Sequence, residues 1–170
     1  MRRAVALCLA VCISPIAFGQ DSQLYRVSIG SSVVINALSP TQVRTHPMTA
    51  GNVQFFDSRW FVNVNSPAGA SVTFEADPFT NSAHTTYQRD VQLRLRRLRN
   101  IRGAAWGFDD RVDRTRIASG NNRAVVTMST DSAGAANVSI RVRFITGADP
   151  QGTLAAGNYL TTVVGTIAAN

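Results

Sequence analysis

Arginine is the residue type in this chain whose number and spacing point most directly to chemistry. All 17 basic residues are arginines, and the formal net charge of the 170 residues is +7. Arg94 and Arg96 alternate with leucines in one segment, and Arg141 and Arg143 alternate with apolar residues in another. Guanidinium groups bind sulfate, phosphate and carboxylate through two parallel hydrogen bonds. These four arginines are therefore candidate ligands for an anionic partner.

The same spacing favours a β-sheet as the element that positions these arginines. On a strand, Arg94 and Arg96 would share a face at a separation of about 6–7 Å, and Arg141 and Arg143 would do so on a second strand. Together the two strands would build one basic sheet face for an acidic glycan or a lipid head group. The alternative is a solvated outer face on which arginine discourages pairing between molecules. No base-stacking aromatic residues are interleaved with these arginines, so nucleic acid is not expected as a partner.

Few of the remaining residues support catalysis. The chain has no lysine, and its two cysteines, Cys8 and Cys12, lie in an N-terminal segment that we expect to be removed. These absences exclude thiolate nucleophiles, cysteine-ligated zinc and Schiff bases from the mature domain. The two histidines, His46 and His84, are too few for a three-histidine zinc site. We therefore expect a protein that is not an enzyme and that uses no cofactor.

Two groups of acidic residues leave weaker alternatives open. Glu75 and Asp77 lie two residues apart and could reach the separation of about 5–10 Å that a glycosidase requires. Asp109, Asp110 and Asp113 could supply oxygen ligands to Ca²⁺, but their spacing does not match an EF-hand loop. We interpret both groups as polar surface residues and expect no metal site.

The first 19 residues have the organisation of a cleavable signal peptide. Met1-Arg2-Arg3 precedes an apolar run over residues 4–13, and Ala17 and Gly19 are the small residues that signal peptidase requires. An apolar run of about ten residues is too short to cross a membrane as a helix. We expect residues 1–19 to be removed and residues 20–170 to form a single domain with no transmembrane segment. The mature protein would be secreted, periplasmic or displayed on the cell surface.

Alternation of apolar and polar residues recurs along the rest of the chain and predicts β-strands. Residues 91–98 are ambiguous, because Val91, Leu95 and Leu98 also have helical spacing, but Leu93 fits only the strand pattern. The polar stretch 109–122 is expected to be a loop. About eight or nine strands without a helix of normal length predict an all-β fold, an antiparallel two-sheet β-sandwich of immunoglobulin-like type. Its expected core includes Val27, Ile35, Trp60, Val62, Phe74, Ile140 and Val163.

The C-terminal run 154–167 contains a turn of small residues, then Gly157, Tyr159 and alternating threonine and valine. This run resembles the last strand of secreted bacterial pilin-like sandwiches, such as the spore coat protein U and fimbrial subunit group. The resemblance implies subunits that polymerise by donating a strand to a neighbour, with residues 23–37 as the candidate donor. The alternative, which we favour, is that residues 23–37 form the first strand or two of the domain itself.

These observations favour a non-enzymatic, exported structural or surface-interaction protein, in the manner of a pilin-like or coat-like subunit. The alternative function is a carbohydrate-binding module that takes acidic glycans on the arginine-rich sheet face. Self-association is the interaction expected in the first case, and a cell-surface glycan is the partner expected in the second.

Overall fold

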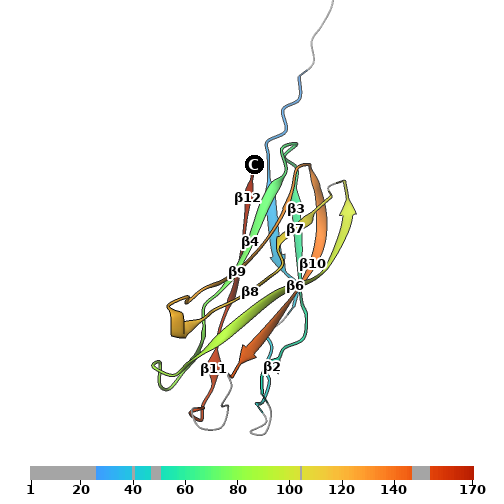
Figure 1. Cartoon of the computed structure of the whole chain (residues 1–170). Helices are drawn as coiled ribbons and strands as arrows, with labels where there is room; N and C mark the ends of the chain where they lie inside the picture. Colours follow the sequence, from blue (N-terminus) through green and yellow to red (C-terminus); the bar gives the residue numbers. More distant parts are fainter. Residues whose placement is uncertain (1–25, 40, 47–50, 104, 147–153) are drawn as a thin grey trace, which may run out of the picture.

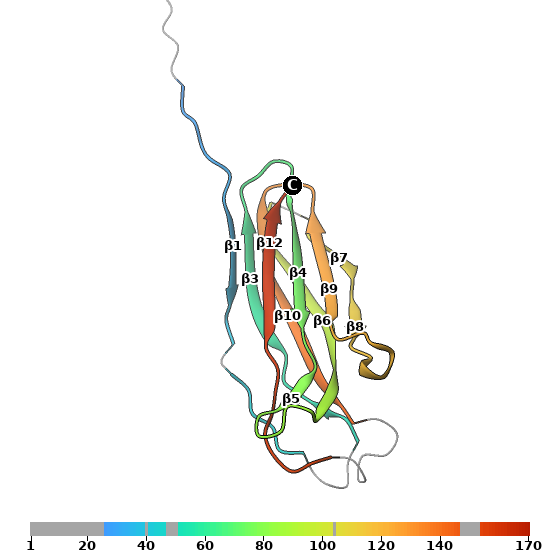
Figure 2. The same ribbon diagram turned by 90° about the vertical axis from the view of Figure 1, so that its left-hand side faces the viewer.

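The computed structural model describes residues 26–39, 41–46, 51–103, 105–146 and 154–170, which form two antiparallel sheets packed against each other (Figure 1, Figure 2). The predicted all-β class and two-sheet arrangement are confirmed. The predicted signal peptide, residues 1–19, lies outside the described residues.

The larger sheet has eight strands, with the order β1-β3-β10-β6-β5-β11 and with β2 and β8 paired to β10 and β6. Its strands are β1 (Val33–Ala37), β2 (Val53–Gln54), β3 (Ser58–Val64), β5 (Phe79–Asn81), β6 (Gln88–Arg102), β8 (Val112–Arg114), β10 (Gly134–Ile145) and β11 (Tyr159–Leu160). The smaller sheet has the order β12-β4-β9-β7. Its strands are β4 (Ala70–Ala76), β7 (Gly107–Asp110), β9 (Ala124–Thr130) and β12 (Val163–Ala169).

The core lies between the sheets and is built from the inward-facing residues of each alternating strand. Phe74, Leu93 and Ile140 are fully buried there, and Trp60 packs edge-on against Phe74 with ring centroids 5.2 Å apart. One end of the sandwich is closed by aromatic contacts that join Phe79, Phe144 and Tyr159. Most outward-facing residues of the same strands are polar, as the sequence pattern predicts, and Phe61, Val125 and Val164 are exceptions.

Two of the points at which the chain passes from one sheet to the other lie next to each other. Asp77 and Pro78 separate β4 of the smaller sheet from β5 of the larger one, and residues 161–162 separate β11 from β12. The Thr161 hydroxyl donates a hydrogen bond of 2.6 Å to the backbone oxygen of Asp77 and so joins the two crossovers. The single final strand predicted at 159–167 is therefore two strands in different sheets.

The ambiguous segment 91–98 is part of β6, a strand of 15 residues. A β-bulge separates the pairs Ile140↔Leu95 and Ser139↔Arg97, and Arg96 is the extra residue. The bulge turns both Leu95 and Leu98 toward the core, because it adds one residue between two positions of the same face. The helical spacing of these leucines is thus the result of an irregular strand.

The first strand begins later than the sequence predicts. β1 pairs with β3 from Val33↔Val64 to Ala37↔Trp60, as expected for a strand of the domain itself. Residues 26–32 form no strand, and the prediction that Val27 lies in the core is wrong, because Val27 is 87% exposed. The physical reason is that β3 ends at Val64 and leaves these residues no strand to pair with.

Another correction concerns residues 109–122, which the sequence predicts to be a loop. The segment contains the end of β7, all of β8 and a short 3₁₀ turn at Ile117–Ser119. The sequence does not predict these strands because their side chains are mostly polar. In the structure, two of these side chains form hydrogen bonds with β9: Asp113 accepts one of 2.9 Å from the Val125 backbone, and Asp109 accepts one of 2.9 Å from Ser129.

Candidate anion-binding site

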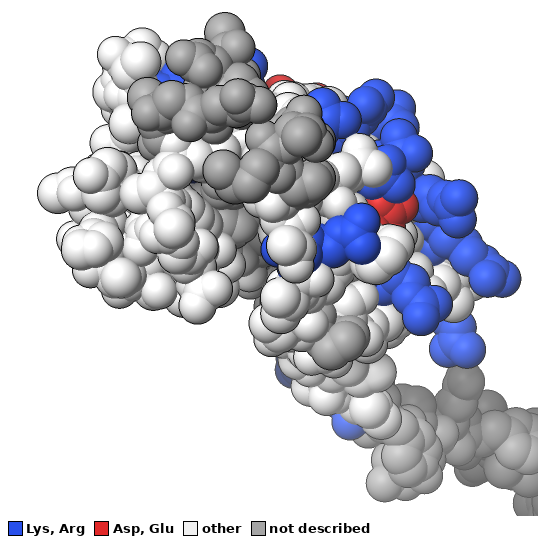
Figure 3. Space-filling model, turned by 90° about the horizontal axis from the view of Figure 1, so that it is seen from below, with Lys and Arg blue, Asp and Glu red and all other residues white. Residues whose placement is uncertain are grey.

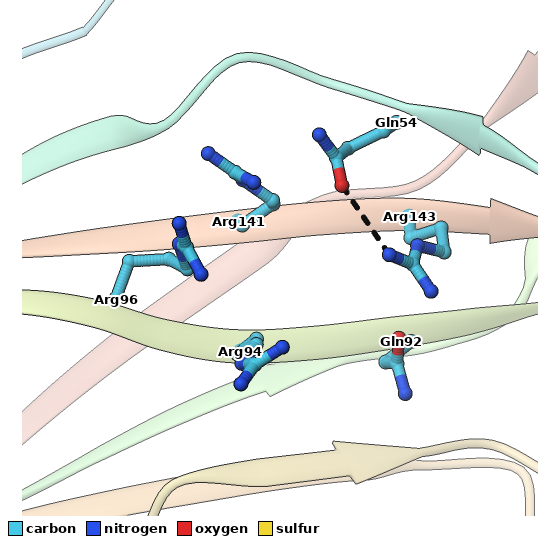
Figure 4. Close-up of a pocket in the computed structure, with 6 residues that line it drawn as sticks. All are labelled: Gln54, Gln92, Arg94, Arg96, Arg141 and Arg143. Carbon is cyan, nitrogen blue, oxygen red and sulfur yellow. Dashed lines mark hydrogen bonds between the residues drawn. The ribbon is translucent and has the colours of Figure 1, made fainter.

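The four arginines predicted to bind an anion surround one hollow on the outer face of the larger sheet (Figure 4). Two strands supply all four of them, β6 and β10, and β2 borders the other side of β10. We call the following lining residues the arginine hollow: Gln54, Gln92, Arg94, Arg96, Arg141 and Arg143.

Strand register explains why arginines far apart in the sequence meet here. Arg94 and Arg141 lie directly opposite each other in the antiparallel pair β6–β10, and Arg143 lies opposite Gln92. On the other side of β10, Arg143 lies opposite Gln54 and donates a hydrogen bond of 3.3 Å from Nη2 to its Oε1. Because the intervening residues of β6 and β10 point into the core, these side chains all point outward.

Arg96 reaches the hollow from the bulge of β6. The backbone around the bulge is held by Arg111, whose Nε donates a hydrogen bond of 3.1 Å to the oxygen of Leu95. Leu95 in turn donates a backbone hydrogen bond of 2.9 Å to the oxygen of Arg111. The Nε of Arg96 is buried and has no hydrogen-bond partner among the described residues. Arg96 therefore brings to the hollow a guanidinium whose Nε donor is not used by the described residues.

The electrostatics of the hollow are strongly one-sided. Asp57 accepts a hydrogen bond of 2.6 Å from Nε of Arg141, and about a quarter of each side chain is exposed. Within the described part of the chain, no carboxylate forms an ion pair with Arg94, Arg96 or Arg143. Like charges directly opposite on neighbouring strands destabilise a sheet by roughly 0.2–1 kcal/mol. Asp57 compensates the charge of Arg141 in the pair Arg94↔Arg141, so the uncompensated charge of this pair is that of Arg94.

The size of the hollow limits what it accepts. Its volume is about 40 Å³, and a single water requires roughly 10–15 Å³ measured in the same way. The hollow thus holds about three waters, or one small anionic group such as a carboxylate or sulfate. A larger ligand would place one charged group in the hollow and extend across the sheet face.

Arginine is not confined to the hollow. Figure 3 shows basic side chains in a band along one side of the molecule, with one small acidic patch inside it. Sequence reasoning missed Gln54, Gln92 and Asp57, because they contact the arginines only through strand pairing and loop position. Gln92 carried a usable signal, since it lies two residues before Arg94 on the same polar face of its strand.

The acidic residues and histidines singled out in the sequence are held in structural contacts. Arg123 lies between Glu75 and Asp77, with nitrogen–oxygen distances of 3.2 and 3.4 Å, so a guanidinium joins the two carboxylates. His46 places Nε2 3.1 Å from the Gly51 oxygen, and His84 lies beside the ring of Tyr87. In the described ranges, no group of three or more His, Cys, Asp or Glu side chains is arranged to hold a metal ion.

Comparison with known proteins gives no match: no family model, no curated protein and no solved structure matches the chain. Among the described residues, no helix has both the length and the apolar character needed to span a membrane.

Proposed function

We propose that this protein is a non-enzymatic, exported surface-interaction protein that binds an acidic glycan through the arginine hollow. The observation that supports this function best is the convergence of four guanidinium groups from two strands on one hollow. Asp57, which pairs with Arg141, is the only carboxylate of the described residues that forms an ion pair with any of them. The positive charge of the hollow is therefore available to a ligand.

The composition of the hollow favours a glycan over a lipid surface. A membrane-binding face combines cations with apolar side chains that enter the acyl region, whereas all six lining residues here are arginine or glutamine. The amides of Gln54 and Gln92 add hydrogen-bonding groups of the kind that sugar hydroxyls need. A charged sugar would thus find an anion site and neutral hydrogen-bond partners within one patch.

Calorimetric titration with trigalacturonate and with a heparin disaccharide tests this function. We expect binding by the wild-type chain that weakens as salt is raised. Arg94→Gln removes an exposed guanidinium that has no ion pair with the described residues, and it should lower affinity about tenfold, as expected when a charge-assisted hydrogen bond of about 1.5 kcal/mol is lost.

The matched control for this test is Arg26→Gln, which removes the same charge from a segment that runs away from the domain (Figure 2). A thermal melt of both variants verifies that they are folded. Equal affinity of the two variants, or failure of the wild-type chain to bind either acidic probe, would rule out the proposed function.

A second candidate function, assembly of copies of this chain, is favoured by residues 26–32. Val27 and Ile29 are 87% and 85% exposed, and they lie two residues apart in a segment that forms no strand of its own domain. Such a segment is suited to adding a strand to the sheet edge of a neighbouring copy. In this proposal the sandwich is an immunoglobulin-like, pilin-like subunit.

Light scattering after size-exclusion chromatography tests the assembly function. The wild-type chain should form oligomers whose mass increases with concentration, because strand addition is intermolecular. Val27→Ser combined with Ile29→Ser should yield monomers, since the segment would no longer bury apolar side chains. A wild-type chain that stays monomeric over the accessible concentration range would exclude assembly through this segment.

A further inference from the structure

The two bulges of β6 keep a series of arginines on one face of the sheet. The first bulge adds Arg96, and the second adds Ile101, because the pairs on either side of it are Ala136↔Asn100 and Ala135↔Arg102. With regular alternation, the arginines after each of these positions would point to the core face of the sheet. The extra residue in each bulge makes them point to the outer face instead. The following four residues therefore point outward in one row, which we call the β6 arginine row: Arg94, Arg97, Arg99 and Arg102.

The register with β10 confirms that these four residues share a face. Their partners are Arg141, Ser139, Asn137 and Ala135, which are successive alternate residues of β10. Beyond Arg141, these partners are neutral, so the row has an uncharged border on that side. All four arginines of the row are exposed, and among the described residues none of them has a carboxylate at ion-pair distance.

The row is long and evenly spaced. The stretch of β10 from residue 141 back to residue 135 spans about 20 Å along the strand, with about 7 Å between successive rows of side chains. One end of the row is the arginine hollow, which already contains Arg94. A ligand with a single charge would use the hollow alone, whereas a chain with regularly repeated charges would contact every arginine of the row.

We propose that β6 is a binding track for a linear acidic polysaccharide. One anionic group of the polymer lies in the arginine hollow, and the following groups pair with Arg97, Arg99 and Arg102. This inference rests on the proposed function, because it takes the hollow as the place where the polymer is anchored. It adds the class of ligand, an unbranched polymer with repeated charges, and the direction in which that polymer lies.

A nucleic-acid site and a protected sheet edge would each differ from a polysaccharide track. A single-stranded nucleic acid also has repeated charges, but its binding sites combine cations with aromatic side chains for base stacking, and the row and its β10 partners contain none. Arginines can also protect a sheet edge, and β6 beyond Arg96 pairs with β10 only, within the described strands. If the arginines only protect an edge, their removal would increase aggregation and leave ligand binding unchanged.

The experiment is a titration with oligogalacturonates of increasing length, from the dimer to the dodecamer, at low and moderate salt. The track variant carries Arg97→Gln, Arg99→Gln and Arg102→Gln. The control variant removes the same charge from exposed arginines outside the row, with Arg26→Gln, Arg44→Gln and Arg116→Gln. Arg94→Gln reports separately on the hollow. Light scattering measures the oligomeric state of every variant.

We expect the affinity of the wild-type chain to increase with oligomer length until the ligand spans the row and then to level off. The track variant should bind the shortest oligomers within twofold of the wild-type affinity and should lose about tenfold for the longest, since three exposed ion pairs together contribute about 1.5 kcal/mol. Its affinity for long oligomers should also depend less on salt than that of the control variant.

The outcomes separate the track from the hollow. If Arg94→Gln weakens binding but affinity does not depend on oligomer length, the track is overturned and the proposed function stands. If no oligomer binds the wild-type chain, both are overturned. If a single-stranded polythymidylate with the same number of charges binds more tightly than the oligogalacturonate, the assignment of the ligand as a polysaccharide is overturned. A track variant that aggregates but binds long oligomers as the control does would assign the row to edge protection instead.

Discussion

The contact between Ile35 and Gly165 tests whether the first strand belongs to its own domain. A Cβ atom at Gly165 would lie 2.8 Å from Cδ1 of Ile35, and 3.0 Å from both Phe74 Cε1 and Trp60 Cζ3. Contacts below about 3 Å force the surrounding atoms to move, and overpacking of this kind costs about 1–3 kcal/mol. We therefore expect Gly165→Ala to destabilise the protein by about 1–2 kcal/mol, after the gain from a less flexible unfolded chain.

A second substitution makes this prediction specific to β1. Ile35→Val removes the Cδ1 atom of the closest contact and alone should cost about 0.5–1.5 kcal/mol. Combined with Gly165→Ala it should cost less than the sum of the two single losses, by about 0.5–1 kcal/mol, because the shortest contact is gone. The relief is partial, since Phe74 and Trp60 remain close to the new methyl group.

Urea unfolding of the four proteins in this cycle, followed by tryptophan fluorescence, measures the coupling. Gly107→Ala is the matched control, because Gly107 also lies in a strand of the smaller sheet and nothing lies within 4 Å of its added Cβ. It should change the free energy of unfolding by less than about 1 kcal/mol in either direction. Strict additivity of Ile35→Val and Gly165→Ala would refute the packing of β1 against β12.

Three further substitutions test the hollow and two glycines with positive φ. Asp57→Asn removes the carboxylate 2.6 Å from Arg141 and should lower the free energy of unfolding by about 1 kcal/mol. It should also raise the affinity for acidic ligands, because it frees a guanidinium of the hollow. Melts with and without sulfate measure both effects, and weaker sulfate binding by Asp57→Asn would contradict the hollow as an anion site. Gly69→Ala should cost more than about 3 kcal/mol, because Gly69 has a φ of +82° and its added Cβ would lie 1.9 Å from the Thr130 oxygen. Gly120 has a φ of +79° but open space around its added Cβ, so Gly120→Ala should cost only about 1 kcal/mol in the same denaturation experiment. Equal losses of stability in Gly69→Ala and Gly120→Ala would refute the steric argument.

Alternation along the chain was sufficient to predict the sheets but not their irregularities. The strand at β10 is regular, so its inward residues follow directly from the sequence. In β6 the bulge at Arg96 produces the spacing of Leu95 and Leu98, which no count of residues can distinguish from a helix. The segment around Val27 shows the opposite error: its pattern is regular, but β3 ends before it can serve as a partner.

The arginine hollow illustrates the same limit for a binding site. Arginine type and spacing identified four of its residues, because an alternating strand places them on one face. Register could not be predicted, since it depends on which strands become neighbours, and Gln54 joins the hollow only because β2 pairs with β10. Contacts made by strand pairing follow from the whole topology, which is not encoded in any short segment.

The position of the arginines in the sheet bears on the choice between a binding face and a solvated face. Charge is used to protect edge strands from pairing with other molecules, but β10 has β6 on one side and β3 and β2 on the other. Arg141 and Arg143 therefore protect no edge, and the pair Arg94↔Arg141 places like charges opposite each other, of which Asp57 compensates only that of Arg141. Arg94 faces a like charge and forms no ion pair with the described residues, and such a residue is best explained by what it binds. The melts with and without sulfate measure this directly, since an anion that enters the hollow should raise the melting temperature of the wild-type chain more than that of Arg94→Gln.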